Sequence, residues 1–147
     1  MQVERTSPDD DALRGWMASH PLASLWQSPA WAAFQRACGR TVHAYAGRID
    51  GRIAAGALAV ADRTAGGYAT WDLPRGPLLE ENLPEDAAAA FFDAIGRDAL
   101  ADKAISLFCS PAGGTPPPGM RPSGRHEQPE ATVLLDLTLD DEALMAQ

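Results

Sequence analysis

The segment Trp71-Asp72-Leu73-Pro74-Arg75-Gly76-Pro77-Leu78 places a guanidinium on a stiff turn. Pro74 and Pro77 lack the N–H that a strand ladder needs and fix φ near about −65°. Gly76 permits a backbone geometry or a close approach that a Cβ would block. Arg75 is therefore held at a strand end, where it could grip a phosphate or carboxylate through two parallel hydrogen bonds. The alternative is a strand-exit turn whose arginine is solvated.

Upstream, residues 29–38 predict a helix that carries one polar group on an apolar face. Ser28 suits the N-cap and Pro29 the first helical position, and Gly39 supplies the stop. Positions i, i+3, i+4 and i+7 share one helical face, and they are occupied here by Trp31, Phe34, Gln35 and Cys38. We expect the two aromatic residues in the core whatever the function. The amide of Gln35 could contact a ligand or, as a boundary residue, bond to the backbone.

The elements around these two segments predict a mixed sheet flanked by helices. Asp50-Gly51 is a strong hairpin signal between two strands. The second of these strands is almost continuously apolar, which is typical of a central strand covered on both faces. Strand, helix and strand in succession indicate a crossover with a parallel or mixed neighbour. The predicted strands cover residues 41–49, 52–61, 68–73, 104–109 and 133–137. Three more helices are predicted: one over 7–17 that is capped by Ser7, one of about five turns that opens at 82–85 and closes at Lys103, and one that begins at 140. A Pro/Gly-rich loop covers 110–130.

The composition fits one domain with an acidic character. The 147 residues include 12 Lys and Arg against 20 Asp and Glu, a formal net charge of -8. This balance argues against nucleic-acid binding by this segment, because affinity for phosphates comes from clustered basic side chains. No apolar run is long enough to span a bilayer, and the N-terminus has no signal-peptide pattern. We therefore expect a cytoplasmic protein without an integral membrane segment.

Several other chemistries lack the residue pattern that they need. The histidines and cysteines show no metal-ligand spacing, so no metal site is expected. Cys38 and Cys109 are expected to be reduced, packed thiols. The aspartates at positions 9–11 are interpreted as complementing a helix N-terminus. No turn of the Arg/Gln-x-x-Gly-x-Gly/Ala type, which binds the pyrophosphate of acyl-CoA, occurs in the sequence. We therefore predict no cofactor.

Three motifs together resemble the N-terminal part of the FemABX family. Gln-Ser-x-x-Trp-x-x-Phe-Gln begins at Gln27, a strand hairpin follows, and Pro-Arg-Gly-Pro-Leu begins at Pro74. Residues 128–137 resemble the family's strand before its first long basic helix, and residues 140–145 resemble the acidic start of that helix. The motifs occur in the family's order over most of residues 20–147.

The resemblance implies an aminoacyltransferase that moves an amino acid from aminoacyl-tRNA to a peptidoglycan precursor peptide during cross-bridge formation. Members of the family consist of two acetyltransferase-like (GNAT-like) subdomains. Residues 1–147 are therefore expected to form the first GNAT-like subdomain, an α/β fold that is incomplete at the C-terminus and truncated before the second subdomain. We expect this segment alone to be inactive and aminoacyl-tRNA to bind mainly through the missing C-terminal part.

The resemblance also implies where the acceptor binds. In the family the first subdomain holds a nucleotide- or lipid-linked muropeptide precursor. Arg75, presented by a turn with Gly76 and Pro77, would pair with the diphosphate of the precursor. Gln35 would hydrogen-bond the acceptor, and Trp31 would stack on a base or form a wall of the pocket. Some members have lysine at the position of Gln35, and this chain lacks that charge. No catalytic residue or general base is identified.

Two alternatives to this function stay open at the level of sequence. A GNAT-like acyltransferase of another pathway, such as exopolysaccharide assembly, would use a different acyl donor. A non-catalytic half would only bind a partner or a nucleotide sugar.

Overall fold

A computed structural model gives the fold of most of the chain. It describes residues 1–64, 66–111 and 120–124 and the single residues 138, 140, 142 and 145. The predicted strand 133–137, nearly all of the predicted helix from 140 and most of the loop 110–130 lie outside the described residues.

Ten elements follow one another along the described chain. They are β1 (Gln2–Thr6), α1 (Asp11–Ser19), the short 3-10 helix η1 (Leu25–Gln27), α2 (Pro29–Ala37), β2 (Thr41–Ile49), β3 (Arg52–Arg63), β4 (Ala69–Pro74), β5 (Leu78–Leu79), α3 (Glu85–Ala101) and β6 (Ala104–Ser110).

These strands form one mixed sheet, as the sequence predicts. The strand order is β1-β2-β3-β4-β6, and the short β5 pairs with β3 beside this path. The neighbours are antiparallel except β4 and β6, which run parallel because α3 makes the crossover between them. The apolar strand β3 is central, and its residues 53–61 are buried, which confirms the expectation from its composition. The predicted α/β mixed sheet flanked by helices is thus present.

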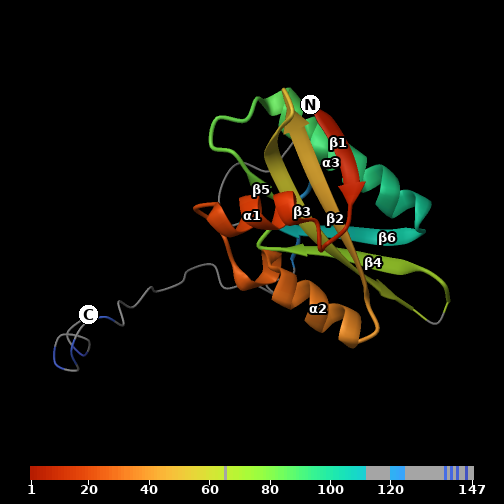
Figure 1. The fold of residues 1–147 in the computed structure, drawn as a ribbon. Helices are drawn as coiled ribbons and strands as arrows, with labels where there is room; N and C mark the ends of the chain where they lie inside the picture. The colour runs from red at the N-terminus through yellow and green to blue at the C-terminus, as the bar shows by residue number, and fades with distance from the viewer. Residues whose placement is uncertain are drawn as a thin grey trace.

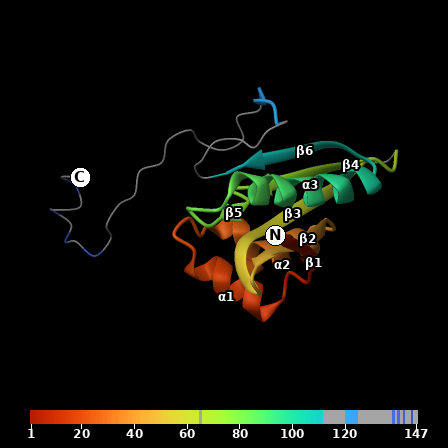
Figure 2. The ribbon, with the colours of Figure 1, turned by 90° about the horizontal axis from the view of Figure 1, so that it is seen from above.

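Helices cover both faces of the sheet and enclose two separate cores. Figures 1 and 2 show α3 on one face and α1 with α2 on the other. The α3 face is packed by aromatic and small residues, namely Tyr45, Ala55, Ala57, Ala59, Ala61, Ala69, Trp71, Leu73, Phe91, Ile95 and Ala99. The opposite face is packed by Leu13, Met17, Ala32, Val42, Ala44, Ala46, Ile53, Leu58, Val60 and Leu78.

The N-terminal region differs from the prediction in two ways. Residues Gln2–Thr6 form the edge strand β1, which the sequence analysis did not identify. The first helix begins at Asp11 and not at Ser7, because Asp10 is its cap and accepts a hydrogen bond from the Leu13 N–H at 2.8 Å. The hydroxyl of Ser7 instead accepts from the Asp9 N–H at 3.1 Å.

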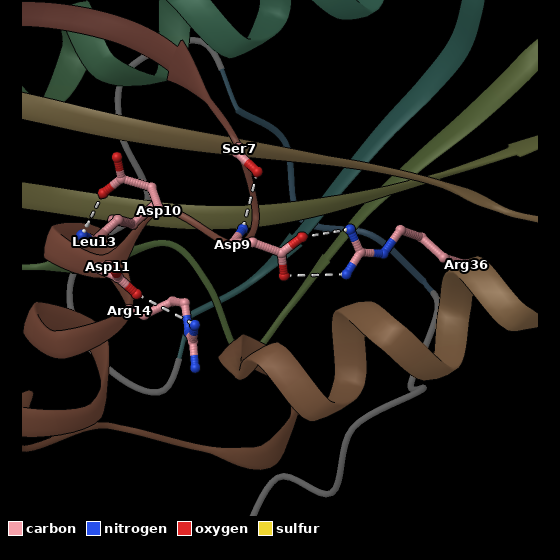
Figure 3. A network of polar contacts seen from close by, with 7 residues as sticks. All are labelled: Ser7, Asp9, Asp10, Asp11, Leu13, Arg14 and Arg36. Carbon is pink, nitrogen blue, oxygen red and sulfur yellow. Dashed lines mark hydrogen bonds and ion pairs between the residues drawn. The ribbon is translucent and has the colours of Figure 1, made fainter.

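The aspartate run also joins two helices. Asp9 forms an ion pair with Arg36 of α2, with 3.0 Å between Arg36 Nη1 and Asp9 Oδ2 (Figure 3). The hydrogen bond from Arg36 holds the pKa of the Asp9 carboxyl below its usual value. Of the three consecutive acids, Asp10 caps α1 and Asp11 lies in its first turn, as predicted, whereas Asp9 holds the start of α1 beside the end of α2.

Helix α2 begins as predicted but turns a different face to the sheet. The Ser28 hydroxyl accepts from the Trp31 N–H at 3.2 Å, and Pro29 occupies the first turn. The buried residues are Ala32 and Gln35, whereas Phe34 is 54% exposed. The expectation that Phe34 belongs to the core is wrong, because the small Ala32 is the residue that allows the helix to approach the sheet.

Helix α3 ends slightly earlier than predicted. It ends at Ala101, and Lys103 follows with φ of 57° in the left-handed region before β6 begins. Both cysteines are free thiols, but Cys38, which was expected to be packed, is exposed at the end of α2, while Cys109 lies in β6.

Candidate functional site

A cavity of about 390 Å³ opens beside α2. Helices α2 and α3 lie on opposite faces of the sheet (Figure 2). The cavity lies where β3, β4 and β6 meet the end of η1 and one side of α2. Eleven residues line it: Trp26, Trp31, Gln35, Arg40, Val60, Asp62, Thr70, Trp71, Asp72, Pro74 and Phe108. Two of the predicted site residues, Trp31 and Gln35, are therefore in its wall, together with the first residue of the Pro-Arg-Gly-Pro turn.

Strand alternation explains which side chains reach the cavity. Successive side chains of a strand point to opposite faces of the sheet. In β4, Trp71 and Leu73 pack into the core below α3, so Thr70, Asp72 and Pro74 fall on the cavity side, although Trp71 also contributes to the cavity lining. Within the sheet, Asp72 lies opposite Val60 of β3.

Aromatic rings form one wall of the cavity. Trp31 lies edge-on to Trp26 with 6.4 Å between ring centroids, and its ring lies 5.4 Å from that of Phe34. The Nε1–H of Trp31 is buried and has no hydrogen-bond partner among the described residues. This wall can therefore stack on a flat or apolar ring and can offer a hydrogen bond to an acceptor on a ligand.

A polar chain of three residues forms a second wall. The side chain of Gln35 is buried, and its Oε1 accepts a hydrogen bond of 2.7 Å from Nη1 of Arg40. Nε of Arg40 donates in turn to Asp62 Oδ2 at 3.0 Å. Gln35 thus bonds to a guanidinium, where the sequence analysis considered a ligand or the backbone. Arg40 thus places a positive charge beside Gln35, the position at which some members of the family have lysine and this chain does not.

The Pro-Arg-Gly-Pro turn begins at the edge of this cavity. Gly76 donates its N–H to the carbonyl of Leu73 at 3.2 Å, and Arg75 has φ of 52°. Gly76 and Pro77 are buried, and Arg75 is partly exposed. Of this turn, only Pro74 is in the cavity wall, so Arg75 lies one residue beyond it. A left-handed φ is costly for an arginine, and such strain is concentrated at functional sites.

A buried amide, Gln27, supports the turn from below. Its Oε1 accepts from the Leu58 N–H at 2.8 Å, and its Nε2 donates to the carbonyls of Leu58 at 3.2 Å and Pro74 at 2.9 Å. A Cβ on Gly76 would lie 2.6 Å from Nε2 of Gln27, so only glycine fits this contact. The close approach expected at Gly76 is therefore present, and the group that approaches is a side chain of this protein.

Sequence reasoning did not identify Gln27, Arg40 or Asp62 as parts of the site. Gln27 gives a weak signal, because it is a polar residue directly before a helix cap and belongs to the Gln-Ser motif. Arg40 and Asp62 carry no such signal, since their contact joins the start of one strand to the end of another.

The α3 face carries a second set of polar contacts. The hydroxyl of Tyr45 donates to Asp98 at 2.8 Å, and the indole N–H of Trp71 donates to Asp102 at 2.9 Å. Hydrogen bonds from Trp71 and Arg63 lower the pKa of Asp102, although its burial alone would raise it. His43 stacks on Trp71 with 4.4 Å between ring centroids, and burial lowers the pKa of His43 to about 4. Trp71 itself is buried in the core of the α3 face.

Within the described part of the chain, no group of three or more His, Cys, Asp or Glu side chains is placed to hold a metal ion. The helices in the same residues are too short or too polar to cross a bilayer.

Comparison with known proteins identifies a family and a fold. The model of the FemAB family matches residues 10–115, which is more than half of the chain. The crystal structure of FemX is similar, with a TM-score of 0.62 and 22% sequence identity over 73% of this chain and 26% of that chain. The present chain thus spans about a quarter of the length of FemX. No curated protein matches the chain.

Acetyltransferase structures share the fold. A ribosomal-protein-alanine N-acetyltransferase from Brucella melitensis biovar Abortus 2308 has a TM-score of 0.55 and 13% identity over 76% of this chain and 80% of that chain. An acetyltransferase from Trypanosoma brucei has a TM-score of 0.58 and 13% identity over 88% of this chain and 99% of that chain. At such identities the likeness establishes a GNAT-like fold and leaves the chemistry to the site.

Proposed function

Since this chain belongs to the FemAB family, we propose that it acts in the transfer of an amino acid from aminoacyl-tRNA to a peptidoglycan precursor peptide during cross-bridge formation. Residues 1–147 would form the first GNAT-like subdomain and hold the acceptor precursor, in the cytoplasm. Aminoacyl-tRNA would be bound mainly by the second subdomain, because the acidic balance of this segment does not suit a polyanion.

The observation that carries the proposal is the meeting of two distant motifs at one cavity. Trp31 and Gln35 come from the Gln-Ser-x-x-Trp-x-x-Phe-Gln segment, and Pro74 comes from the Pro-Arg-Gly-Pro turn, yet all three line the same space. A largely preformed concave site with a few polar groups is the usual form of a small-molecule site.

The charges in and beside the cavity suggest how the acceptor is oriented. Among the lining residues, the carboxylates of Asp62 and Asp72 face only one guanidinium, that of Arg40, which Asp62 and Gln35 already bind. A diphosphate is therefore disfavoured inside the cavity, whereas hydroxyl, amide and amine groups are favoured there. Arg75, beyond the cavity wall, is the group that we propose for the diphosphate, because a guanidinium can bind phosphate oxygens in pairs.

The role of this segment in the reaction would be alignment. An amine of the acceptor peptide attacks the ester carbonyl that links the amino acid to tRNA, an amide bond forms, and the tRNA hydroxyl leaves with a proton. Holding the sugar and diphosphate at two fixed points limits the motion of the peptide amine. Such positioning can supply a large part of a rate enhancement without a dedicated catalytic group in this segment.

Calorimetric titration with UDP-linked muramyl pentapeptide tests the proposal. We expect saturable binding, and we expect Arg75→Ala to weaken it by about tenfold to a hundredfold, since hydrogen bonds to charged groups contribute about 1.5 to 3 kcal/mol. Arg14→Ala is the matched control, because Arg14 lies on α1 outside the cavity wall and forms an ion pair with Asp11. Its affinity should equal that of the wild type.

The outcomes separate this function from the alternatives. Binding of UDP alone with the affinity of the full precursor would indicate a nucleotide-sugar site without a role for the peptide. No binding by the folded chain would remove the acceptor from this segment. Equal affinities of Arg75→Ala and Arg14→Ala would remove Arg75 from the site while leaving the cavity as the place of binding.

A further inference from the structure

Gln27 fills a gap in the sheet. On β3, residues Val60–Arg63 pair with β4, and Ala55 and Gly56 pair with β5. Leu58 lies between these two stretches, so its N–H and C=O on that side have no strand opposite them. The side-chain amide of Gln27 binds both groups and thus takes the place of a strand residue.

The three hydrogen bonds fix the orientation of the amide. The Leu58 N–H requires an acceptor, whereas the carbonyls of Leu58 and Pro74 require donors. Only one of the two orientations of the Gln27 amide satisfies all three. Because the side chain is only 2% exposed, water does not compete for these groups. A glutamate would place a negative oxygen against two carbonyls, and an apolar residue would leave all three groups without a partner.

Gln27 is also adjacent to both parts of the candidate site. It directly precedes Ser28, the cap of the helix that carries Trp31 and Gln35. Its third hydrogen bond ends on Pro74, the residue before Arg75. A single buried amide therefore connects the start of α2, the middle of β3 and the end of β4.

We propose that Gln27 is a positioning residue that sets Arg75 relative to Trp31 and Gln35, and so fixes the distance between the diphosphate and the rest of a bound acceptor. The inference rests on the proposed acceptor site. Gln27 contacts no ligand itself, and it acts by holding the carbonyl of Pro74, from which the turn departs. Gly76 is part of this arrangement, because the absence of a Cβ lets the turn lie against the amide of Gln27.

A double-mutant cycle tests whether Gln27 acts through Arg75. Gln27→Met keeps the length of the side chain and removes its hydrogen bonds. We expect it to weaken binding of UDP-linked muramyl pentapeptide by about tenfold, because a displacement of about 1 Å at a remote position can cost up to a hundredfold. In an Arg75→Ala background the same substitution should have almost no further effect. If the two effects simply multiply, Gln27 does not position Arg75 and the inference is overturned.

A second variant keeps the test valid if Gln27→Met does not fold. Gly76→Ala retains all of the hydrogen-bonding groups but places a Cβ 2.6 Å from Nε2 of Gln27, so the amide or the turn must move. It should weaken binding to a similar degree and lose that effect in the Arg75→Ala background. Gly15→Ala is the control, since nothing lies within 4 Å of its added Cβ.

Hydrogen exchange separates failure of this inference from failure of the proposed function. If the wild type does not bind the precursor, the proposed function is wrong, and the amides of Leu58 and Gly76 still report on Gln27. We expect both amides to lose protection from exchange in Gln27→Met, whereas the backbone amides that pair β1 with β2 should stay protected. Unchanged protection of Gly76 would overturn the role of Gln27 in holding the turn.

Discussion

The two faces of the sheet are covered in different ways. On one face, α3 contacts β1 and β6 and covers a continuous core of aromatic and alanine residues (Figure 2). On the other face, α1 and α2 contact β2 and β3, and the cavity opens beside α2 above β4 and β6. The same six strands thus carry a core on each side, and the described cavity lies on the α2 side.

The difference follows from what each helix presents to the sheet. Phe91 and Ile95 of α3 fill the space above the alanines of β3. One hydrogen bond from a tyrosine and one from a tryptophan, each to an aspartate, add to that layer. Helix α2 presents Ala32 and the amide of Gln35 instead. We therefore expect the loss of a ring from the α3 face to cost more stability than the loss of a ring from α2, beside which polar groups line the cavity.

The largest test of this comparison is a pair of phenylalanine truncations. Phe91→Ala removes a ring with 0% exposure from the α3 face, and we expect the free energy of unfolding to fall by about 3 to 5 kcal/mol. Phe34→Ala removes a ring that is 54% exposed on α2, and we expect a change of about 0.5 kcal/mol or less. Urea unfolding followed by tryptophan fluorescence measures both. Similar losses for the two variants would contradict the comparison.

A smaller effect should come from the polar contacts of the α3 face. Tyr45→Phe removes the hydroxyl that donates to Asp98 and leaves the ring in place, so we expect a loss of about 1.5 to 3 kcal/mol. Tyr68→Phe is the matched control, because Tyr68 is 54% exposed, and it should be neutral within about 0.5 kcal/mol. Thermal unfolding by calorimetry distinguishes the two. A neutral Tyr45→Phe would show that the Asp98 contact adds nothing to the stability of the α3 face.

His43 predicts a pH dependence of the same face. Burial, then the charge of Arg5, lower its pKa to about 4, while the nearby carboxylates of Asp98 and Asp102 raise it and Arg63 lowers it. In the unfolded chain His43 therefore binds a proton near the ordinary pKa of about 6.5, whereas in the folded protein it is still neutral at that pH. Stability should fall as the pH drops from about 6.5 and stop falling for this reason near pH 4.

The variant His43→Phe isolates that contribution. Phenylalanine can keep the stacking on Trp71 but cannot bind a proton. We expect the wild type to lose about 1 to 2 kcal/mol relative to the variant between pH 7 and pH 4, less than the full linkage value because neighbouring charges and solvent screen the imidazolium. Unfolding by urea at several pH values measures the difference. Parallel curves for the two proteins would exclude His43 as the titrating group.

Local signals account for the parts of the fold that the sequence predicted well. Asp50 and Gly51 have φ of 49° and 79°, as a tight hairpin requires, and the strand Thr41–Ile49 has the predicted bounds. Ser28 and Pro29 likewise fix the start of α2 through contacts within one turn. Each of these features is determined by residues that are neighbours in the chain.

The parts that sequence reasoning missed depend on distant partners. Strand β1 exists because Gln2 through Thr6 pair with β2 some 40 residues later, and its own composition has no strong strand pattern. The site has the same property, because Gln27 meets Leu58 and Pro74 only after the sheet has formed. The helix that carries Trp31 and Gln35 was predictable from local spacing, whereas the contacts that join Gln27 to β3 and β4 required the topology.

The two cysteines offer the mildest test of the comparison between faces, since their modification need not disturb the fold. Cys109 packs beside the α3 core, and burial raises the pKa of its thiol to about 12, whereas Cys38 is exposed at the end of α2. Because the thiolate is the reactive form, Cys38 should react with a disulfide reagent at pH 8 and Cys109 only after unfolding. Mass spectrometry of the labelled protein identifies the site, and Cys38→Ser is the control. Rapid labelling of Cys109 in the folded chain would contradict the comparison, because it would show that α3 does not cover β6 tightly. The contrast between the two faces would then not extend to β6 at the edge of the sheet.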